Sequence, residues 1–253
     1  FLLPAFSGIA AADPAIRPGD HIAIIGNTFA DQLRVHGYLE TLLLQRTQEN
    51  PVSIRNLGWG ADTLSTRERP TNFPTEESTL LAHGTDVIIA CFGMGESFAG
   101  KDGIEKFSQD LVNFITSHSG KQYNGSSEVR LILVSPIAHE QLGELTPGVK
   151  HRNRELLAYC QAMAKVASAR AIPFVNLYEQ TLYLMEDDGA PRLTANGIHL
   201  NSYGYWAASR ILADTLLPGD PSWLLQVDAQ SGKAAARGAL ISAVRPRDGG
   251  IHF

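Results

Sequence analysis

The feature that most constrains the fold of this chain is an alternation, from His21 onward, of short continuous apolar runs with amphipathic stretches. This alternation is the pattern of βαβ units, which build a mostly parallel sheet. Because each run is continuous, helices are expected to cover both faces of that sheet. The runs predict five strands in one sheet, over residues 22–27, 53–57, 87–92, 131–135 and 174–177.

Apolar residues at helical spacing mark the segments between these strands. The stripes are Val35, Leu39 and Leu42; Ile104, Phe107, Leu111 and Phe114; and Leu156, Cys160, Met163 and Ala167. A last helix is predicted over residues 203–216, with Tyr205, Ala208, Leu212 and Leu216 on one face and Pro218-Gly219 after its end. The whole pattern predicts an α/β protein.

Three parts of the chain are expected. A main domain over residues 19–217 can hold a continuous core, since chains of this length bury most of their surface. Residues 1–18 look like the end of a secretory signal peptide, which predicts export to the periplasm or the cell exterior; the alternative is an apolar arm packed on the domain. Residues 218–253 form a C-terminal extension that is a hairpin, a linker or a surface tail, and the sequence does not choose among these.

Composition and motifs exclude several kinds of ligand. The net charge of −5 provides no basic surface for nucleic acid. No apolar run reaches the ~18 residues that a membrane span requires. Cys91 and Cys160 lie in apolar patterns and are interpreted as core residues, and the histidines lack metal-ligand spacing, so neither a metal nor another cofactor is expected. The oligomeric state is not predictable from the sequence.

Gly-rich polar segments follow three of the predicted strands, at residues 26–28, 56–63 and 93–97. Ligands of open parallel sheets bind at the carboxyl ends of strands, so these segments are expected to converge. A fourth segment, 196–201, precedes the last helix and contains His199. None of the four matches a phosphate-binding or dinucleotide-binding motif.

In order and spacing, these four segments resemble those of the SGNH or GDSL-type ester hydrolases. The anchors are Gly26-Asn27-Thr28, the segments 56–63 and 93–97, and Asn196-Gly197-Ile198-His199. The resemblance implies a three-layer α/β/α, flavodoxin-like fold around a five-stranded parallel sheet. It also implies hydrolysis of a small-molecule or carbohydrate ester, such as an acetylated sugar.

The resemblance implies roles for five positions. Thr28 stands at the nucleophile, where the family has serine, and His199 is the base. Asn196 replaces the aspartate that orients this histidine. The oxyanion hole would use the amide of Thr28, the amide of Ala61 (or Gly60 if the loop is shifted by one residue) and Gly95, where the family has a side-chain donor in asparagine.

Each of these positions also has a purely structural interpretation. Thr28 can cap the following helix by accepting an N–H from Ala30 or Asp31, and Glu96 can anchor its loop or be a solvated carboxylate. Asp62 is a candidate substitute for the missing carboxylate beside His199. Trp59, Phe98 and Tyr203 could contact a sugar, although such residues more often serve packing.

Two functions follow from these departures. In the first, the protein is an ester hydrolase with a degraded catalytic site. In the second, the same fold has no activity and binds a ligand or serves as a structural module of a larger exported protein. The first requires the hydroxyl of Thr28 and the imidazole of His199 to meet in an open pocket.

Overall fold

The structure, a computed structural model, describes residues 14–186, 189–219, 224–228, 231–238, 240–241, 245–247 and 250–252. The chain divides after Pro218 into two compact units, which are described separately. The signal-peptide interpretation falls mainly on residues 1–13, which lie outside the described residues. Residues 15 and 16 pack on the larger unit, where the buried Ile16 donates its N–H to the Leu216 carbonyl at 3.1 Å.

The larger unit contains the predicted five-stranded parallel sheet. Its strands are β1 (His21–Gly26), β2 (Ser53–Asn56), β3 (Val87–Cys91), β4 (Arg130–Val134) and β5 (Phe174–Val175), in the order β2-β1-β3-β4-β5. This order is that of flavodoxin-like folds. The predicted fold class is therefore confirmed, and every predicted strand is found within two residues of its expected ends.

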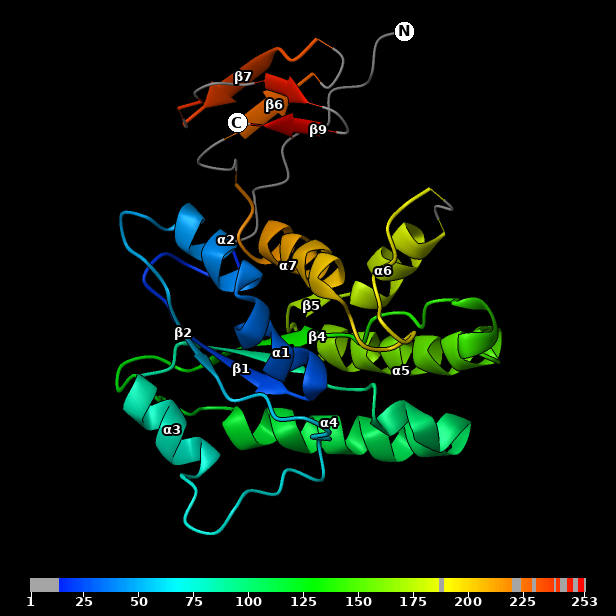
Figure 1. The fold of residues 1–253 in the computed structure, drawn as a ribbon. Coiled ribbons are helices and arrows are strands. Elements are labelled where there is room, and N and C mark those ends of the chain that lie inside the picture. Colours follow the sequence, from blue (N-terminus) through cyan, green and yellow to red (C-terminus); the bar gives the residue numbers. More distant parts are fainter. Residues whose placement is uncertain are drawn as a thin grey trace, which may run out of the picture. The chain divides into compact units, whose positions relative to one another are not determined.

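Helices cover both faces of the sheet, which explains why its strands are apolar throughout (Figure 1). Ile22 and Ile24 pack into the core shared with α1 (Thr28–His36), α2 (Tyr38–Arg46) and α7 (Ser202–Leu216). Ala23 and Ile25 face the other core, beneath α3 (Glu76–His83), α4 (Ile104–His118) and α5 (Val149–Ala169). The remaining helical segments are η1 (Glu96–Gly103), η2 (Gly143–Leu145) and α6 (Leu177–Met185).

The predicted helix containing Val35, Leu39 and Leu42 is wrong in detail. Gly37 adopts φ 66°, a left-handed conformation that glycine accepts easily, and it separates α1 from α2. The change of direction leaves Val35 61% exposed and brings Leu39 and its neighbour Leu43 into the core. The other predicted stripes are buried as expected, apart from Ile104, which is partly buried.

The described residues of the smaller unit form two antiparallel strand pairs. β6 (Leu224–Val227) pairs with β7 (Ala234–Arg237), and β8 (Arg245–Arg247) pairs with β9 (Gly250–His252). Antiparallel pairing is the feature expected of the hairpin alternative for this extension. No helix in the part of the chain that the structure describes is long and apolar enough to cross a membrane.

Candidate active site

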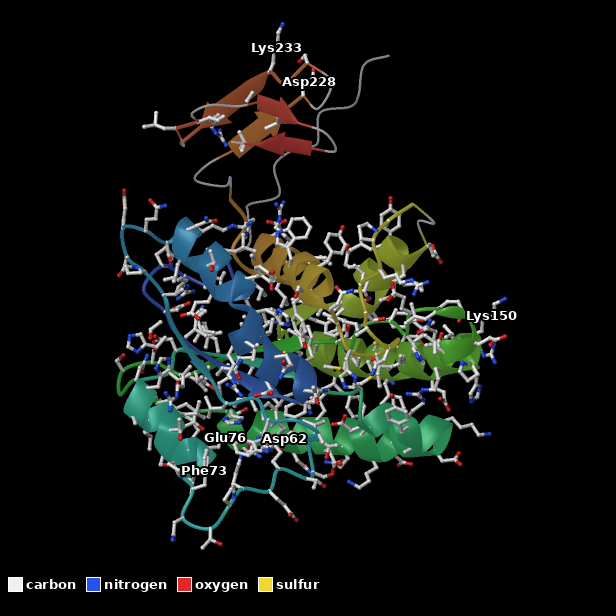
Figure 2. All side chains as sticks on the ribbon, viewed as in Figure 1. Asp62, Phe73, Glu76, Lys150, Asp228 and Lys233 are labelled. Atoms are coloured by element: carbon white, nitrogen blue, oxygen red, sulfur yellow. The ribbon has the colours of Figure 1, made fainter. Side chains whose placement is uncertain are left out.

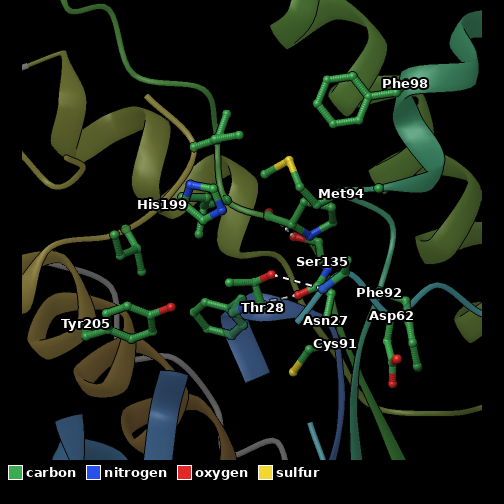
Figure 3. Close-up of a pocket in the computed structure, with 17 residues that line it drawn as sticks. Asn27, Thr28, Asp62, Cys91, Phe92, Met94, Phe98, Ser135, His199 and Tyr205 are labelled. Atoms are coloured by element: carbon green, nitrogen blue, oxygen red, sulfur yellow. Dashed lines mark hydrogen bonds between the residues drawn. The ribbon is translucent and has the colours of Figure 1, made fainter. Parts of the chain in front are cut away.

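The four predicted segments line one pocket of about 230 Å³ at the carboxyl ends of β1 and β3 (Figure 3). From β1 the chain passes to β2 on one side of the sheet, whereas β3 lies on the other side, so the pocket is at the topological switch point where α/β proteins bind ligands. Its lining includes Thr28, Ala61, Gly95 and His199. The structure thus brings these four residues together.

Thr28 is positioned by the residue before it. Asn27 donates its N–H to the Cys91 carbonyl at 3.2 Å, and its side chain caps α1 by accepting the Phe29 N–H at 3.0 Å. The capping interpretation of Thr28 is therefore wrong. Instead, Thr28 Oγ1 accepts the backbone N–H of Ala61 at 3.2 Å. As the first residue of α1, Thr28 has an N–H without a helical acceptor, and N–H groups at this position of a helix can bind an anion.

Ala61 is held in a strained conformation. Its φ is 67°, in the left-handed region that costs an L-residue about 1–2 kcal/mol. The loop is fixed on both sides, because Trp59 donates its N–H to the Gly26 carbonyl at 2.9 Å and Asp62 donates to Trp59 at 3.1 Å. Ala61, and not Gly60, lines the pocket. The loop therefore holds Ala61 in a strained backbone conformation, and this conformation directs its amide to Thr28 Oγ1.

Gly95 supplies no side-chain donor to the pocket. Its φ of −64° and ψ of −45° suit any residue, but a Cβ there would lie 3.3 Å from Cγ2 of Thr63. The next residue, Glu96, accepts the N–H groups of Leu64 and Gly93, each at 2.9 Å. Burial raises the pKa of the Glu96 carboxyl, an effect that these hydrogen bonds oppose. Glu96 is thus an anchor for the loop and not a solvated carboxylate.

Asn196 orients His199 from behind. Its Oδ1 accepts the His199 backbone N–H at 2.9 Å, and its amide contacts ring Nδ1 through Nδ2 at 2.9 Å and Oδ1 at 3.2 Å. With Oδ1 as acceptor, Nδ1 carries the proton and Nε2 is left as the basic nitrogen; with Nδ2 as donor, the tautomer is reversed. Within the described structure no hydrogen bond joins Thr28 to His199.

Asp62 does not replace the missing carboxylate. It is buried and accepts two hydrogen bonds from Arg69, at 2.9 and 2.6 Å. Figure 3 places Asp62 across the pocket from His199. The ring of His199 therefore has a neutral partner in Asn196, which cannot stabilise an imidazolium by charge.

A buried carboxylate that the sequence did not single out holds the histidine loop. Glu140 accepts the N–H groups of Leu193 at 2.9 Å and Thr194 at 2.7 Å, and also the Thr194 hydroxyl. That hydroxyl in turn accepts the Gly197 N–H at 3.0 Å, while the Glu140 N–H donates to the Gly197 carbonyl at 2.9 Å. Glu140 thus fixes the segment that carries His199.

The remaining lining of the pocket is mostly apolar. Cys91 forms part of it, and burial raises the pKa of its thiol to about 12, so the thiol stays protonated and is not a nucleophile. Burial also raises the pKa of the Tyr205 phenol. Phe98 lies at the pocket under the guanidinium of Arg152, 4.2 Å from its ring centroid. Trp59 and Tyr203, the other aromatic candidates, are not part of this lining.

Among the described side chains, no group of three or more His, Cys, Asp or Glu residues could hold a metal ion.

Residues 19–207 match the model of the GDSL-like lipase/acylhydrolase family. Compared with the curated proteins, the chain has no match. Among solved structures, it resembles a catalytic mutant of Axe2, an acetylxylan esterase from Geobacillus stearothermophilus, with 16% identity and a TM-score of 0.61 over 80% of this chain and 96% of that one. It also resembles LAE5, an alpha/beta hydrolase from the metagenome of Lake Arreo, Spain, with 16% identity and a TM-score of 0.56 over 81% and 98% of the two chains.

A third similar structure is that of a gut microbial diltiazem-metabolizing enzyme, with 18% identity and a TM-score of 0.60. The match covers 91% of this chain but 54% of the other, so the present chain spans about half the length of that protein. At these identities the likeness establishes the fold.

Proposed function

The chain belongs to the GDSL-like lipase/acylhydrolase family, and from that premise we propose that it hydrolyses carboxylic esters with Thr28 as nucleophile and His199 as base. The observation that carries this proposal is the pocket itself, which holds a hydroxyl, an imidazole and two loop amides at one rim of the sheet. An alcohol needs a positioned base to become nucleophilic, and the developing oxyanion needs preorganised donors.

In the proposed reaction, Thr28 Oγ1 attacks the ester carbonyl carbon while His199 Nε2 accepts the hydroxyl proton. The tetrahedral oxyanion is held by the backbone N–H groups of Thr28, Ala61 and Gly95. Collapse breaks the bond to the alkoxy oxygen, which leaves as the alcohol with the proton from His199. Water, deprotonated by His199, then attacks the acyl-threonine, releasing the acid and restoring Thr28.

Three departures from the family pattern lower the expected rate. The methyl group of Thr28 restricts χ1 and crowds the approach to the carbonyl. Loss of a side-chain donor at Gly95 is expected to lower the rate by about 100- to 1,000-fold. Asn196 orients the ring but is neutral, so it does not stabilise by charge the imidazolium that forms during the reaction. We therefore expect slow turnover.

The proposed substrate is a small acyl or acetyl ester, including esters of carbohydrates. An open pocket with mostly apolar walls suits an acyl group, and the similar Axe2 structure is described as an acetylxylan esterase. We also propose that the protein is exported, on the strength of the small-residue pattern near the start of the sequence.

The test is hydrolysis of p-nitrophenyl esters and acetylated sugars by the full chain and by Thr28→Ala and His199→Ala. Each variant is expected to lose nearly all turnover, whereas Thr41→Ala, on the exposed surface of α2, is expected to keep it. Equal turnover by all four proteins would overturn the proposal.

A gain-of-function series makes the test sharper. Thr28→Ser with Gly95→Asn restores the family's nucleophile and donor, and Thr63→Ser removes the methyl group that would crowd the new side chain. The triple variant is expected to exceed the double variant in kcat, and both are expected to exceed the wild type.

The second candidate function is ligand binding without turnover. The hydrogen bond from the Ala61 amide to Thr28 Oγ1 favours it, because it occupies a donor that the oxyanion would need. In that case the wild type shows no hydrolysis that depends on Thr28, but the pocket still binds an ester analogue, and Met94→Trp, which fills the pocket, abolishes that binding.

A further inference from the structure

A second and larger cleft, of about 550 Å³, is lined in part by Leu57, Gly58 and Trp59 of the loop that carries Ala61. It is formed by the end of β2, by α1 and by the segment that leads into α3. We call it the arginine cleft, because four arginines line it: Arg34, Arg55, Arg67 and Arg69. Two aromatic residues, Trp59 and Phe73, also belong to the lining. Figure 2 labels Phe73 and Glu76 of this cleft together with Asp62, the partner of its Arg69.

The arginine cleft is positively charged although the chain as a whole carries −5. Asp31 and Glu76 are the acidic residues of its lining, and they pair with Arg34 and Arg67 at 2.8 and 2.5 Å. Arg69 pairs with Asp62 of the catalytic pocket. Four cations thus face three carboxylates.

Arg55 is the unpaired cation of this set. It is exposed at the end of β2, and among the described side chains it has no ion pair. An arginine presents a planar fork of donors that matches the two oxygens of a carboxylate. The cleft therefore has room and charge for one additional carboxylate.

Two exposed rings stand beside this charge. Trp59 and Phe73 are 41% and 47% exposed and meet edge to face, with ring centroids 5.5 Å apart. The Arg69 guanidinium lies 4.9 Å from the Trp59 ring centroid, so the indole is held in place on one side. Such fixed, half-exposed rings offer apolar contact area at little entropic cost.

We propose that the arginine cleft binds an acidic sugar. The sugar carboxylate pairs with Arg55, the apolar face of the ring packs on Trp59 and Phe73, and hydroxyl groups donate to the carboxylates of Asp31 and Glu76. A phosphate group fits less well, because it would bring two charges beside those same carboxylates with one unpaired arginine to meet them.

The cleft and the catalytic pocket are linked by α1. Asp31 and Arg34 follow Thr28 by three and six residues, which is about 4.5 and 9 Å along a helix axis. If one glycan spans both sites, the acidic sugar in the cleft is therefore one or two sugar units away from the sugar whose ester lies at Thr28. This link to catalysis rests on the proposed function; binding in the cleft does not.

Binding is tested by titrating the full chain with D-glucuronate, D-glucose and inorganic phosphate, and following amide and indole NMR signals. Glucuronate is expected to bind at least tenfold more tightly than either of the others and to shift the Trp59 indole signal. Arg55→Gln is expected to weaken glucuronate binding by about tenfold, the value of a charge-assisted hydrogen bond, and Arg55→Lys by less.

Matched controls come from a second arginine and tryptophan pair. Arg210 lies 5.8 Å from the ring of Trp206, which is 42% exposed, and both are outside the cleft lining. Arg210→Gln and Trp206→Leu should leave glucuronate binding unchanged, whereas Trp59→Leu should weaken it. Equal affinity for glucuronate and glucose, tighter binding of phosphate, or no effect of Arg55→Gln would each overturn the proposal.

A kinetic experiment separates this proposal from the proposed function. For an acetylated glucuronate oligosaccharide, Arg55→Gln should raise KM about tenfold with kcat unchanged, while KM for the neutral acetylated xylo-oligosaccharide stays the same. If the wild type hydrolyses no ester but binds glucuronate through Arg55, the hydrolase proposal fails and the sugar-binding proposal stands. If the wild type hydrolyses the acidic and the neutral oligosaccharide with the same KM, the sugar-binding proposal fails and the hydrolase proposal stands.

Discussion

At the scale of single residues, the candidate site depends on backbone positions that are strained or tightly anchored. Ala61 has φ 67° and presents its amide to Thr28. An alanine here carries the left-handed penalty that a glycine would avoid.

Ala61→Gly is therefore expected to raise the free energy of unfolding by up to about 1 kcal/mol, since the relief of strain exceeds the added entropy of the unfolded chain. Urea denaturation measures the change. Ala164→Gly, inside α5, is the matched control and should lower stability by about 1 kcal/mol. A loss of stability in Ala61→Gly would show that the loop does not impose the strain.

Glu140 shows the same dependence through a side chain. In the wild type the donors around Glu140 meet a carboxylate, and Glu140→Gln would place an NH₂ group among them. We expect this change to lower the free energy of unfolding by about 3 kcal/mol. We also expect a lower kcat, because the His199 loop is no longer held. Glu144→Gln, on the exposed η2 turn, is the control. Unchanged kcat in a folded Glu140→Gln protein would exclude the positioning role.

At the scale of elements, helix ends connect the core to the loops. His118 closes α4 and is 4% exposed, and its Nδ1 lies 2.9 Å from the Tyr123 hydroxyl. Burial, with a smaller contribution from the Arg67 charge, lowers the pKa of His118 from 6.5 to about 4. The folded state thus keeps this imidazole neutral at pH values where the unfolded chain protonates it.

The sign of the effect on stability follows from proton uptake. Between pH 6.5 and 4 the unfolded state binds more protons, so stability is present in full above pH 6.5 and decreases as the pH falls, by up to about 3 kcal/mol from this group. Urea midpoints from pH 7 to pH 4 should fall more steeply for the wild type than for His118→Gln. His151→Gln, exposed on α5, should behave like the wild type.

At the scale of the whole molecule, the larger unit contains the sheet, both helical layers and the candidate site. We propose that it is an independent domain, in agreement with the expected domain over residues 19–217. A chain ending at Pro218 keeps the Leu217 carbonyl, which accepts a hydrogen bond from Arg46 at 2.8 Å. It should unfold cooperatively, with a Tm within a few degrees of the full chain and unchanged turnover. Calorimetry that showed a broad or absent transition would contradict this.

Much of this architecture could be predicted from the sequence. A continuous apolar run such as 87–92 is typical of a strand whose two faces are both covered by helices. The family resemblance selected the switch point at β1 and β3, where Thr28 and His199 do share a pocket. The role of Glu140 could not be predicted. In the sequence it stands between His139 and Gln141, as an ordinary loop residue would, and the amides that it binds lie more than fifty residues further along the chain. The arginine cleft could not be predicted either, because its lining residues come together only when α1 packs beside the loop after β2.

The two residues proposed to react, Thr28 and His199, are attached to the fold unequally. Thr28 follows β1 after Asn27, whose N–H is bonded to the neighbouring central strand. His199 lies instead on a connecting segment that is held by side-chain hydrogen bonds to Asn196 and Glu140 and by backbone bonds such as that from Ala195 to His199. Amides at the end of β1 should therefore exchange with deuterium at the rate of global opening, and those of residues 195–199 at a faster, local one. Local opening on the imidazole side of the pocket is therefore expected to precede any movement of the proposed nucleophile.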